Sequence, residues 1–294
     1  MSLFAETDAY AKLNLGLKVL GRRPDGYHDI LSVFQTVDLR DRLAFEEISA
    51  GQTEVVCSDP ALPVGPENLV YRAVEALRGA TGFDRGVRVS LTKEIPIGAG
   101  LGGGSADAAA VLRTLNRAWG LGASDGSLRE MALGIGSDVP FFLRGGTAVV
   151  SGRGEVLRYV AWSSEVHYVL VQPPFQVSTG WAYRQVSGRI SLGLTGRSKY
   201  INLINSTMIG PLCARDLFAC AENDFEPVVA EAWPALRDLR RALEGAGAEA
   251  CCMTGSGSVL YGVFYDAAAA GRAAAALRQG GRRVFLSRPL IVDR

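Results

Sequence analysis

Residues 96–107 read PIGAGLGGGSAD, and this glycine-rich stretch constrains the fold more than any other part of the chain. Five glycines fall within seven positions. Before the stretch, Val87, Val89 and Leu91 alternate as in a strand, and after it apolar residues recur with helical spacing from Ala108 onward. A glycine loop that ends at a helix N-terminus brings backbone N–H groups close to an anion. A flexible linker is the alternative, but linkers rarely separate two strongly periodic segments, so we predict phosphate binding.

This loop differs from two other phosphate-binding sequences. No Gly-Lys-Ser/Thr ends it, which excludes a Walker A loop. Residues 98–103 match the pattern G-x-G-x-x-G, but the preceding strand ends several residues too early for a dinucleotide fingerprint. The candidate nucleotide-binding residues are Pro96, Ile97, Gly98, Ala99, Gly100, Leu101, Gly102, Gly103, Gly104, Ser105 and Ala106.

The composition excludes several classes of protein. A chain of 294 residues holds two modest domains or one large one, and its formal net charge of +1 argues against nucleic acid or an anionic membrane as a partner. Five cysteines without C-x-x-C spacing and only two histidines argue against a disulfide framework or a zinc site. No apolar run approaches about 18 residues and no secretion signal is visible, so we expect a cytoplasmic protein.

Strand and helix patterns mix in both halves of the chain without a regular βαβ rhythm, which predicts an α+β fold. We expect strands near residues 9–20, 32–38, 42–47, 54–57, 87–91, 166–171, 250–253, 259–264 and 283–287. We expect helices near residues 68–78, 108–119, 127–133, 224–233, 234–244 and 267–278. Residues 189–199 are rich in glycine and read as a mobile loop.

Three polar residues are candidates for chemistry. Lys12 and Asn14 fall on the same face of the first strand, opposite Leu13 and Leu15. A solvated lysine on an open sheet face explains this pattern equally well. Asp138 stands two residues before Pro140 at the start of a short helix, where it can be an N-cap residue, a catalytic carboxylate or both.

Two further phrases carry little weight on their own. Tyr27 and His28 follow a Pro-Asp-Gly turn, and such a pair is more often local packing than ligand recognition. Residues 253–258 form a second glycine loop between two strands, which alone predicts only a turn.

Together, these phrases resemble the GHMP small-molecule kinases, whose motifs are a lysine-bearing first strand, a glycine-serine phosphate loop and a late glycine loop. The matching phrases occur in family order and are residues 11–15 (AKLNL), 23–29 (RPDGYHD), 100–107 (GLGGGSAD), 136–142 (GSDVPFF) and 254–258 (TGSGS). The Asp-Gly-Tyr-His phrase separates the chain from the mevalonate and homoserine members, and it is typical of members whose substrate carries a cytidine.

The resemblance implies a fold and a set of roles. It implies an N-terminal domain like ribosomal protein S5 over residues 1–160 and a ferredoxin-like C-terminal domain over residues 161–294. Asp138 would be the base and Lys12 its partner on the substrate hydroxyl. The remaining implied substrate-binding residues are Asn14, Tyr27, His28, Thr179 and Tyr183. Tyr27 and His28 would contact the cytosine, Thr179 would touch the substrate tail, and Tyr183 would stack on the base opposite Tyr27. Ala106 stands where a second serine is common in the family, so metal and phosphate contacts there are in question.

The implied activity is phosphorylation of a small cytidyl alcohol, with ATP and Mg²⁺ as cofactors, by a monomer or weak homodimer. Two alternatives stay open at this point. One is another GHMP kinase with a different alcohol substrate. The other is a non-catalytic protein on the same fold that binds nucleotides or RNA, although the neutral charge and only four lysines argue against RNA.

Overall fold

The structure is a computed structural model, and it describes residues 2–190, 199–206, 212–279 and 282–291. The chain forms two compact units from interleaved segments. The first unit comprises Met1–Ala11, Leu39–Ile97 and Gly102–Gly145, and the second comprises Lys12–Asp38, Gly98–Leu101 and Gly146–Arg294. The two long strands β1 (Ser2–Arg22) and β2 (His28–Ile48) pair with each other, and each contributes to both units.

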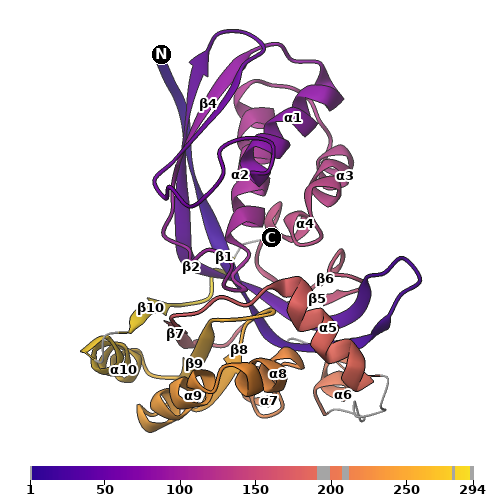
Figure 1. Cartoon of the computed structure of the whole chain (residues 1–294). Helices are drawn as coiled ribbons and strands as arrows, with labels where there is room; N and C mark the ends of the chain where they lie inside the picture. Colours follow the sequence, from indigo (N-terminus) through magenta and orange to yellow (C-terminus); the bar gives the residue numbers. More distant parts are fainter. Residues whose placement is uncertain (1, 191–198, 207–211, 280–281, 292–294) are drawn as a thin grey trace. The chain divides into compact units, whose positions relative to one another are not determined.

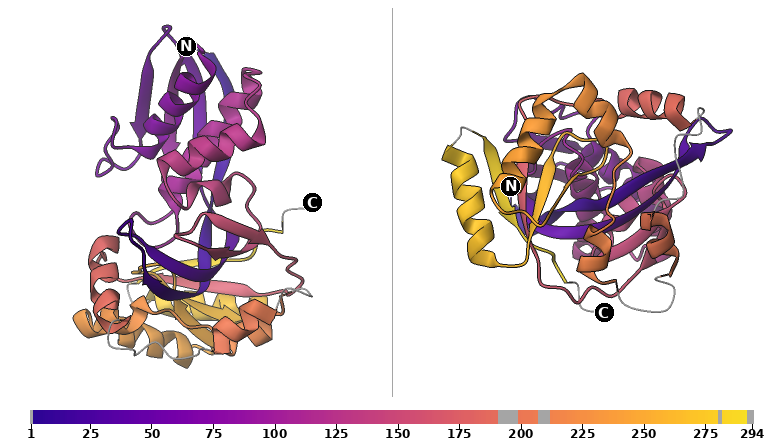
Figure 2. Two further views of the ribbon diagram at one scale, coloured as in Figure 1. Left: turned by 90° about the vertical axis from the view of Figure 1, so that its right-hand side faces the viewer. Right: turned by 90° about the horizontal axis from the view of Figure 1, so that it is seen from below.

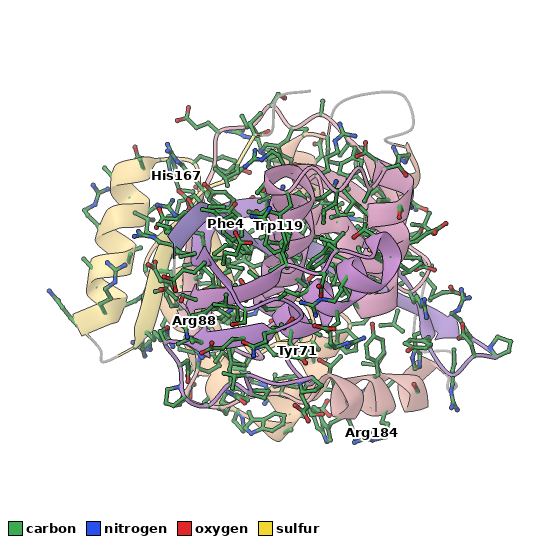
Figure 3. All side chains as sticks on the ribbon, turned by 90° about the horizontal axis from the view of Figure 1, so that it is seen from above. Phe4, Tyr71, Arg88, Trp119, His167 and Arg184 are labelled. Atoms are coloured by element: carbon green, nitrogen blue, oxygen red, sulfur yellow. The ribbon has the colours of Figure 1, made fainter. Side chains whose placement is uncertain are left out.

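The first unit packs helices against a small sheet (Figure 1). Strand β4 (Gly86–Thr92) pairs antiparallel with the Arg42–Ile48 part of β2 and parallel with β3 (Thr53–Cys57). The helices are α1 (Leu69–Thr81), α2 (Gly103–Ala118), α3 (Asp125–Ile135) and α4 (Val139–Phe142). The helix α1 begins where the Asn68 side chain accepts a hydrogen bond from the Val70 N–H, and its buried side chains face α2. Figure 3 shows Phe4 beside Trp119, and the two rings stack with centroids 5.3 Å apart.

The second unit contains an antiparallel sheet in the order β10-β7-β9-β8. These strands are β7 (His167–Gln172), β8 (Ala250–Met253), β9 (Leu260–Phe264) and β10 (Arg283–Ser287). The first half of β2 pairs antiparallel with β5 (Thr147–Ser151), and β5 pairs antiparallel with β6 (Val156–Tyr159). The helices of this unit are α5 (Thr179–Ile190), α6 (Lys199–Ser206), α7 (Ala214–Phe218), α8 (Phe225–Ala232), α9 (Ala235–Gly245) and α10 (Ala267–Gln279).

One apolar core joins the sheet and helices of the second unit. Val169 and Val171 of β7 pack with Phe225 of α8 and with Leu277 of α10. The alanine-rich helix α10 lies along β10 (Figure 2, yellow), and small side chains let it approach the sheet closely. This core includes Met253 of β8 and Leu260 of β9, so it holds the two strands that the late glycine loop connects.

Most predicted elements form close to their expected bounds, with three informative differences. The segments near 32–38 and 42–47 are one strand, β2, rather than two. Residues 11–19 of β1 are buried on both faces, although the alternating pattern predicts one apolar and one polar face. Helices α6 and α7 were not expected. Of the predicted mobile loop at residues 189–199, Arg189 belongs to the last turn of α5 and Lys199 is the first residue of α6. Residues 191–198 lie outside the described residues.

The domain boundary at residues 160 and 161 stays a prediction, because the compact units are interleaved along the chain and do not test that division. Among the helices that the structure describes, none combines the length and the apolar character that crossing a membrane requires.

Candidate active site

The glycine loop adopts backbone conformations that only glycine accepts easily. Gly98, Gly100 and Gly102 have φ angles of +64°, +80° and +71°. At Gly100 the constraint is also steric, because a Cβ there would lie 2.1 Å from the Thr254 carbonyl oxygen. The first and the late glycine loops therefore touch backbone to backbone within the second unit.

The loop ends at the N-terminus of α2 in the first unit. Gly102 is the N-cap residue in a left-handed conformation, and no side chain caps the helix there. The Ala106 N–H donates to the Gly102 carbonyl oxygen over 2.9 Å and starts the helical hydrogen-bond pattern. The N–H groups of the preceding first turn have no carbonyl partner within the helix. Gly104 of that turn is exposed, so an anion can reach these donors from solvent.

Lys12 belongs to the second unit and is only 3% exposed, so the alternative of a solvated surface lysine is wrong. Its Nζ donates to the Asn14 Oδ1 and, over 2.9 Å, to the Gly100 carbonyl oxygen. The ammonium also stands 4.8 Å from the centroid of the Phe34 ring. Two neutral oxygen acceptors and the face of an aromatic ring therefore contact this ammonium.

Asn14 connects the first strand to the late glycine loop. Its backbone N–H donates to the Thr254 Oγ1 over 3.0 Å, and that hydroxyl in turn donates to the Gly100 carbonyl oxygen over 3.1 Å. The Asn14 Nδ2 donates to the Ser32 Oγ over 2.9 Å. The structure therefore joins the lysine strand, the phosphate loop and the late loop, three of the predicted phrases, in one buried network.

Asp138 lies in the first unit, directly before α4, as the sequence predicts. Its side chain makes no capping hydrogen bond, and Pro140 follows within the first turn. Asp138 therefore does not cap α4 through its side chain, and capping does not explain why an aspartate occupies this position. Lys12 belongs to the second unit, so the expected partnership of Lys12 with Asp138 stays a prediction.

His28 and Tyr183 come together in the second unit. Their rings stack with centroids 4.8 Å apart and an interplanar angle of 25°. The His28 Nε2 lies 2.6 Å from the Ser187 Oγ, whose hydroxyl donates to the Tyr183 carbonyl oxygen over 2.7 Å. Because that hydroxyl proton is used, Nε2 carries the donated proton and Nδ1 is left as the acceptor of the neutral ring. Burial lowers the pKa of His28, as does Arg22, which favours this neutral form.

Tyr27 is 52% exposed, and the Arg153 guanidinium lies 4.9 Å from the centroid of its ring. This arrangement supports one ring face and leaves much of the side chain open to solvent. The predicted stacking of a base between Tyr27 and Tyr183 stays a prediction, and His28 already covers one face of Tyr183. Thr179, at the start of α5, lies 2.9 Å through its Oγ1 from the Ser256 Oγ of the late loop.

Sequence reasoning missed several residues that shape this site. Ser32 and Ser187 orient predicted site residues but stand outside every quoted phrase. Asn223 donates from Nδ2 to the carbonyl oxygens of Met253 and Gly255 and so supports the late loop. In the sequence, Asn223 lies between Glu222 and Asp224, just before the start of α8. This position indicates an ordinary helix-capping residue equally well, so it does not single out Asn223 as a support of the late loop.

Comparisons with known proteins identify the family of this chain. The family model of the GHMP kinases N terminal domain matches residues 68–146, and that of the GHMP kinases C terminal domain matches residues 211–283. The 4-diphosphocytidyl-2-C-methyl-D-erythritol kinase of Pelotomaculum thermopropionicum is 42% identical over 95% of this chain and 96% of its own length. The enzyme of the same name from Prosthecochloris aestuarii is 41% identical over 94% and 95% of the two chains.

Solved structures give the same result. A crystal structure of 4-(cytidine 5'-diphospho)-2C-methyl-D-erythritol kinase superposes with a TM-score of 0.81 at 36% identity, covering 97% of this chain and 98% of the other. A homoserine kinase from Cytophaga hutchinsonii shares the fold, with a TM-score of 0.74 at 18% identity over 98% and 96% of the chains. The expected α+β GHMP kinase fold is confirmed, and the chain belongs to the 4-diphosphocytidyl-2-C-methyl-D-erythritol kinase family of GHMP kinases.

Proposed function

We propose that this protein transfers the γ-phosphoryl group of ATP to the 2-hydroxyl of 4-diphosphocytidyl-2-C-methyl-D-erythritol, in non-mevalonate isoprenoid precursor synthesis. The observation that carries the proposal is the 42% identity to a kinase of that name over 95% of the chain. The buried Lys12, the exposed α2 N-terminus and the His28–Tyr183 stack supply the physical support.

The proposed phosphate site is the first turn of α2 together with the glycine loop at residues 96–106. Free N–H groups and the helix dipole favour the negative charge of a phosphate there. The described residues hold no group of three or more His, Cys, Asp and Glu side chains suited to a metal. A Mg²⁺ ion that keeps several waters and is carried mainly by ATP phosphates fits such a site, and it would neutralise charge on the transferred group.

Asp138 is the proposed general base for the substrate hydroxyl, and Lys12 the proposed cation that polarises the same hydroxyl. The Lys12 Nζ donates to the Asn14 Oδ1 and to the Gly100 carbonyl oxygen, and neither of these neutral acceptors cancels its positive charge. A carboxylate that accepts the proton while a nearby cation stabilises the alkoxide is what phosphoryl transfer to an alcohol requires.

The proposed cytosine site contains Tyr27, His28 and Tyr183, with Asn14 and Thr179 toward the rest of the substrate. The neutral His28 has Nδ1 as its acceptor, which suits the exocyclic amino group of cytosine. The rings of Tyr27 and Tyr183 offer faces for stacking. We further propose that the protein acts in the cytoplasm as a monomer or weak homodimer and binds neither nucleic acid nor membranes.

A phosphotransfer assay tests the function directly. The purified protein is incubated with ATP, Mg²⁺ and the cytidyl substrate, and ADP formation is measured beside reactions that contain mevalonate or homoserine instead. We expect turnover only with the cytidyl substrate. Turnover with another alcohol would favour a different GHMP kinase, and RNA binding without phosphotransfer would favour the non-catalytic alternative.

A further inference from the structure

A buried cluster of three charged side chains lies in the first unit, outside the residues assigned above. Lys93 follows β4, Asp41 lies in β2 and Asp107 lies in α2. The Lys93 Nζ donates to the Asp41 Oδ2 and, over 2.8 Å, to the Asp107 Oδ2. The three side chains are at most 6% exposed. Within this cluster, one cation therefore bridges a sheet strand and a helix.

The cluster is tied to the backbone on the sheet side. The Asp41 Oδ1 accepts hydrogen bonds from the N–H groups of Glu94 and Ile95, over 2.6 and 2.9 Å. Both residues immediately precede the glycine loop. Asp41 thus holds the segment that leads into the loop as well as the Lys93 ammonium.

The ammonium also lies against the first residue of α2. A Cβ on Gly103 would stand 3.2 Å from the Lys93 Nζ and 2.9 Å from the Ile95 Cγ2. A cation beside a helix N-terminus is opposed by the helix dipole, so the hydrogen bonds of the Lys93 ammonium to Asp41 and Asp107 must offset this repulsion. Apolar side chains of similar volume often stabilise a core as well as a buried ion cluster does. Stability alone therefore does not account for three charges at this place.

The surroundings raise the pKa values of both Asp107 and Lys93. Burial raises the pKa of Asp107 to about 7, despite the attraction of Lys93. Burial alone would lower the pKa of Lys93, but Asp107 and Asp41 outweigh it and raise the value. The Asp107 Oδ1 has no hydrogen-bond partner among the described residues. Asp107 is therefore needed chiefly as the acceptor that its Oδ2 provides, and not for its full negative charge.

We propose that Lys93 is a positioning residue for ATP: bound between Asp41 and Asp107, it fixes the first turn of α2 against the strands, so that the N–H groups of that turn are preorganised for phosphate. This inference rests on the proposed function, which assigns the ATP phosphates to the same turn. Preorganised donors lose little conformational freedom when the phosphate binds. If the turn shifts by about 1 Å, its N–H groups are misplaced and bind the phosphate much more weakly.

Two variants of Asp107 separate the effect of losing the hydrogen-bond acceptor from the effect of losing the negative charge. Asp107→Asn keeps an oxygen acceptor for Lys93. Asp107→Leu has the same branched shape but carries two larger methyl groups and no acceptor. We expect Asp107→Asn to keep the Kd for ATP within about threefold of wild type, and Asp107→Leu to raise it about tenfold or more. The Kd for the cytidyl substrate should change less than about threefold in both, because no substrate contact is removed.

Lys93→Met is the direct test, and Lys18→Met is its matched control. Lys18 is also a buried lysine between two carboxylates, Glu222 and Asp224, but it lies in the second unit. We expect both methionine variants to lower Tm, whereas only Lys93→Met weakens ATP binding. The Ala106 amide donates to the Gly102 carbonyl oxygen and so closes the first turn of α2. Its hydrogen exchange, measured without ligand, should become faster in Asp107→Leu and Lys93→Met and stay unchanged in Lys18→Met.

The outcomes are distinguishable. Equal Kd for ATP and equal exchange in Asp107→Asn and Asp107→Leu would overturn the positioning role while leaving the proposed function intact. If Lys93→Met does not fold, the Asp107 pair decides the question. Absence of ATP binding by the wild-type protein would overturn both proposals, since no phosphate site would then exist for the cluster to position.

Discussion

Replacement of Gly100 by alanine should destabilise the protein because two independent penalties act at one Cβ. The φ angle of +80° lies in the left-handed region, where an L-residue is disfavoured by about 1–2 kcal/mol. The added carbon would also lie 2.1 Å from the Thr254 carbonyl oxygen and 3.3 Å from that of Gly257. These are backbone atoms that cannot rotate away, and forcing extra volume into such packing typically costs about 1–3 kcal/mol. We therefore expect a loss of about 2–5 kcal/mol.

Gly98→Ala is the matched control for this substitution. Its φ angle is +64°, but the nearest atoms to an added Cβ belong to the Gln176 side chain, at 3.8 Å. Only the conformational penalty applies, so the expected loss is about 1–2 kcal/mol. Urea unfolding of wild type and both variants measures the difference, provided that the slopes agree and the transitions stay two-state.

Gly100→Ala should also reduce kcat, because the Gly100 carbonyl oxygen accepts from the Lys12 Nζ. If Gly100→Ala and Gly98→Ala are equally stable, the backbone contact between the two glycine loops is not a feature of the folded protein. The shared packing of those loops, on which the proposed site depends, would then be refuted.

Asp138→Asn should lower kcat by about 10²–10⁴ with Tm and the Kd for ATP little changed, and near wild-type turnover would refute its role as the base. Tyr27→Ala and Tyr183→Ala should each raise KM for the cytidyl substrate by the equivalent of about 1–3 kcal/mol, measured against an unchanged KM for ATP. The pKa of Asp107 is raised from 3.8 to about 7, so the folded protein keeps a proton that the unfolded chain has released between about pH 4 and 7. Wild type should lose stability as pH rises through that window, whereas Asp107→Asn should lose less, as urea midpoints at pH 5 and pH 8 would test.

The elements that local patterns describe well were predictable from the sequence. Residues 87–119 predict a strand, a glycine loop and a helix, and the structure has β4, positive φ angles at three glycines of the loop, and α2. Short-range chemistry decides these features, because glycine conformations and apolar spacing act within a few residues. The family fold followed from the order of such local phrases.

The contacts of the polar residues were not predictable in the same way. The alternation around Lys12 predicts an open polar face, yet that face is buried, because Asn14, Gly100 and Thr254 meet it there. Asn14 and Thr254 are 240 residues apart in the chain. No local period encodes such a pairing. The Lys93 cluster was missed for the same reason, since its carboxylates are 52 and 14 residues away.

The hydrogen bonds of the second unit explain why three distant phrases must occur together. The buried Lys12 needs acceptors, and Asn14 Oδ1 and the Gly100 carbonyl oxygen provide them. The Thr254 hydroxyl accepts from the Asn14 N–H and donates to that same carbonyl oxygen. Loss of any one member leaves a buried polar group unsatisfied, at about 1–3 kcal/mol each. A change in one of these three phrases is therefore tolerated only with changes in the others, so in this chain they are parts of one buried network and not independent signatures.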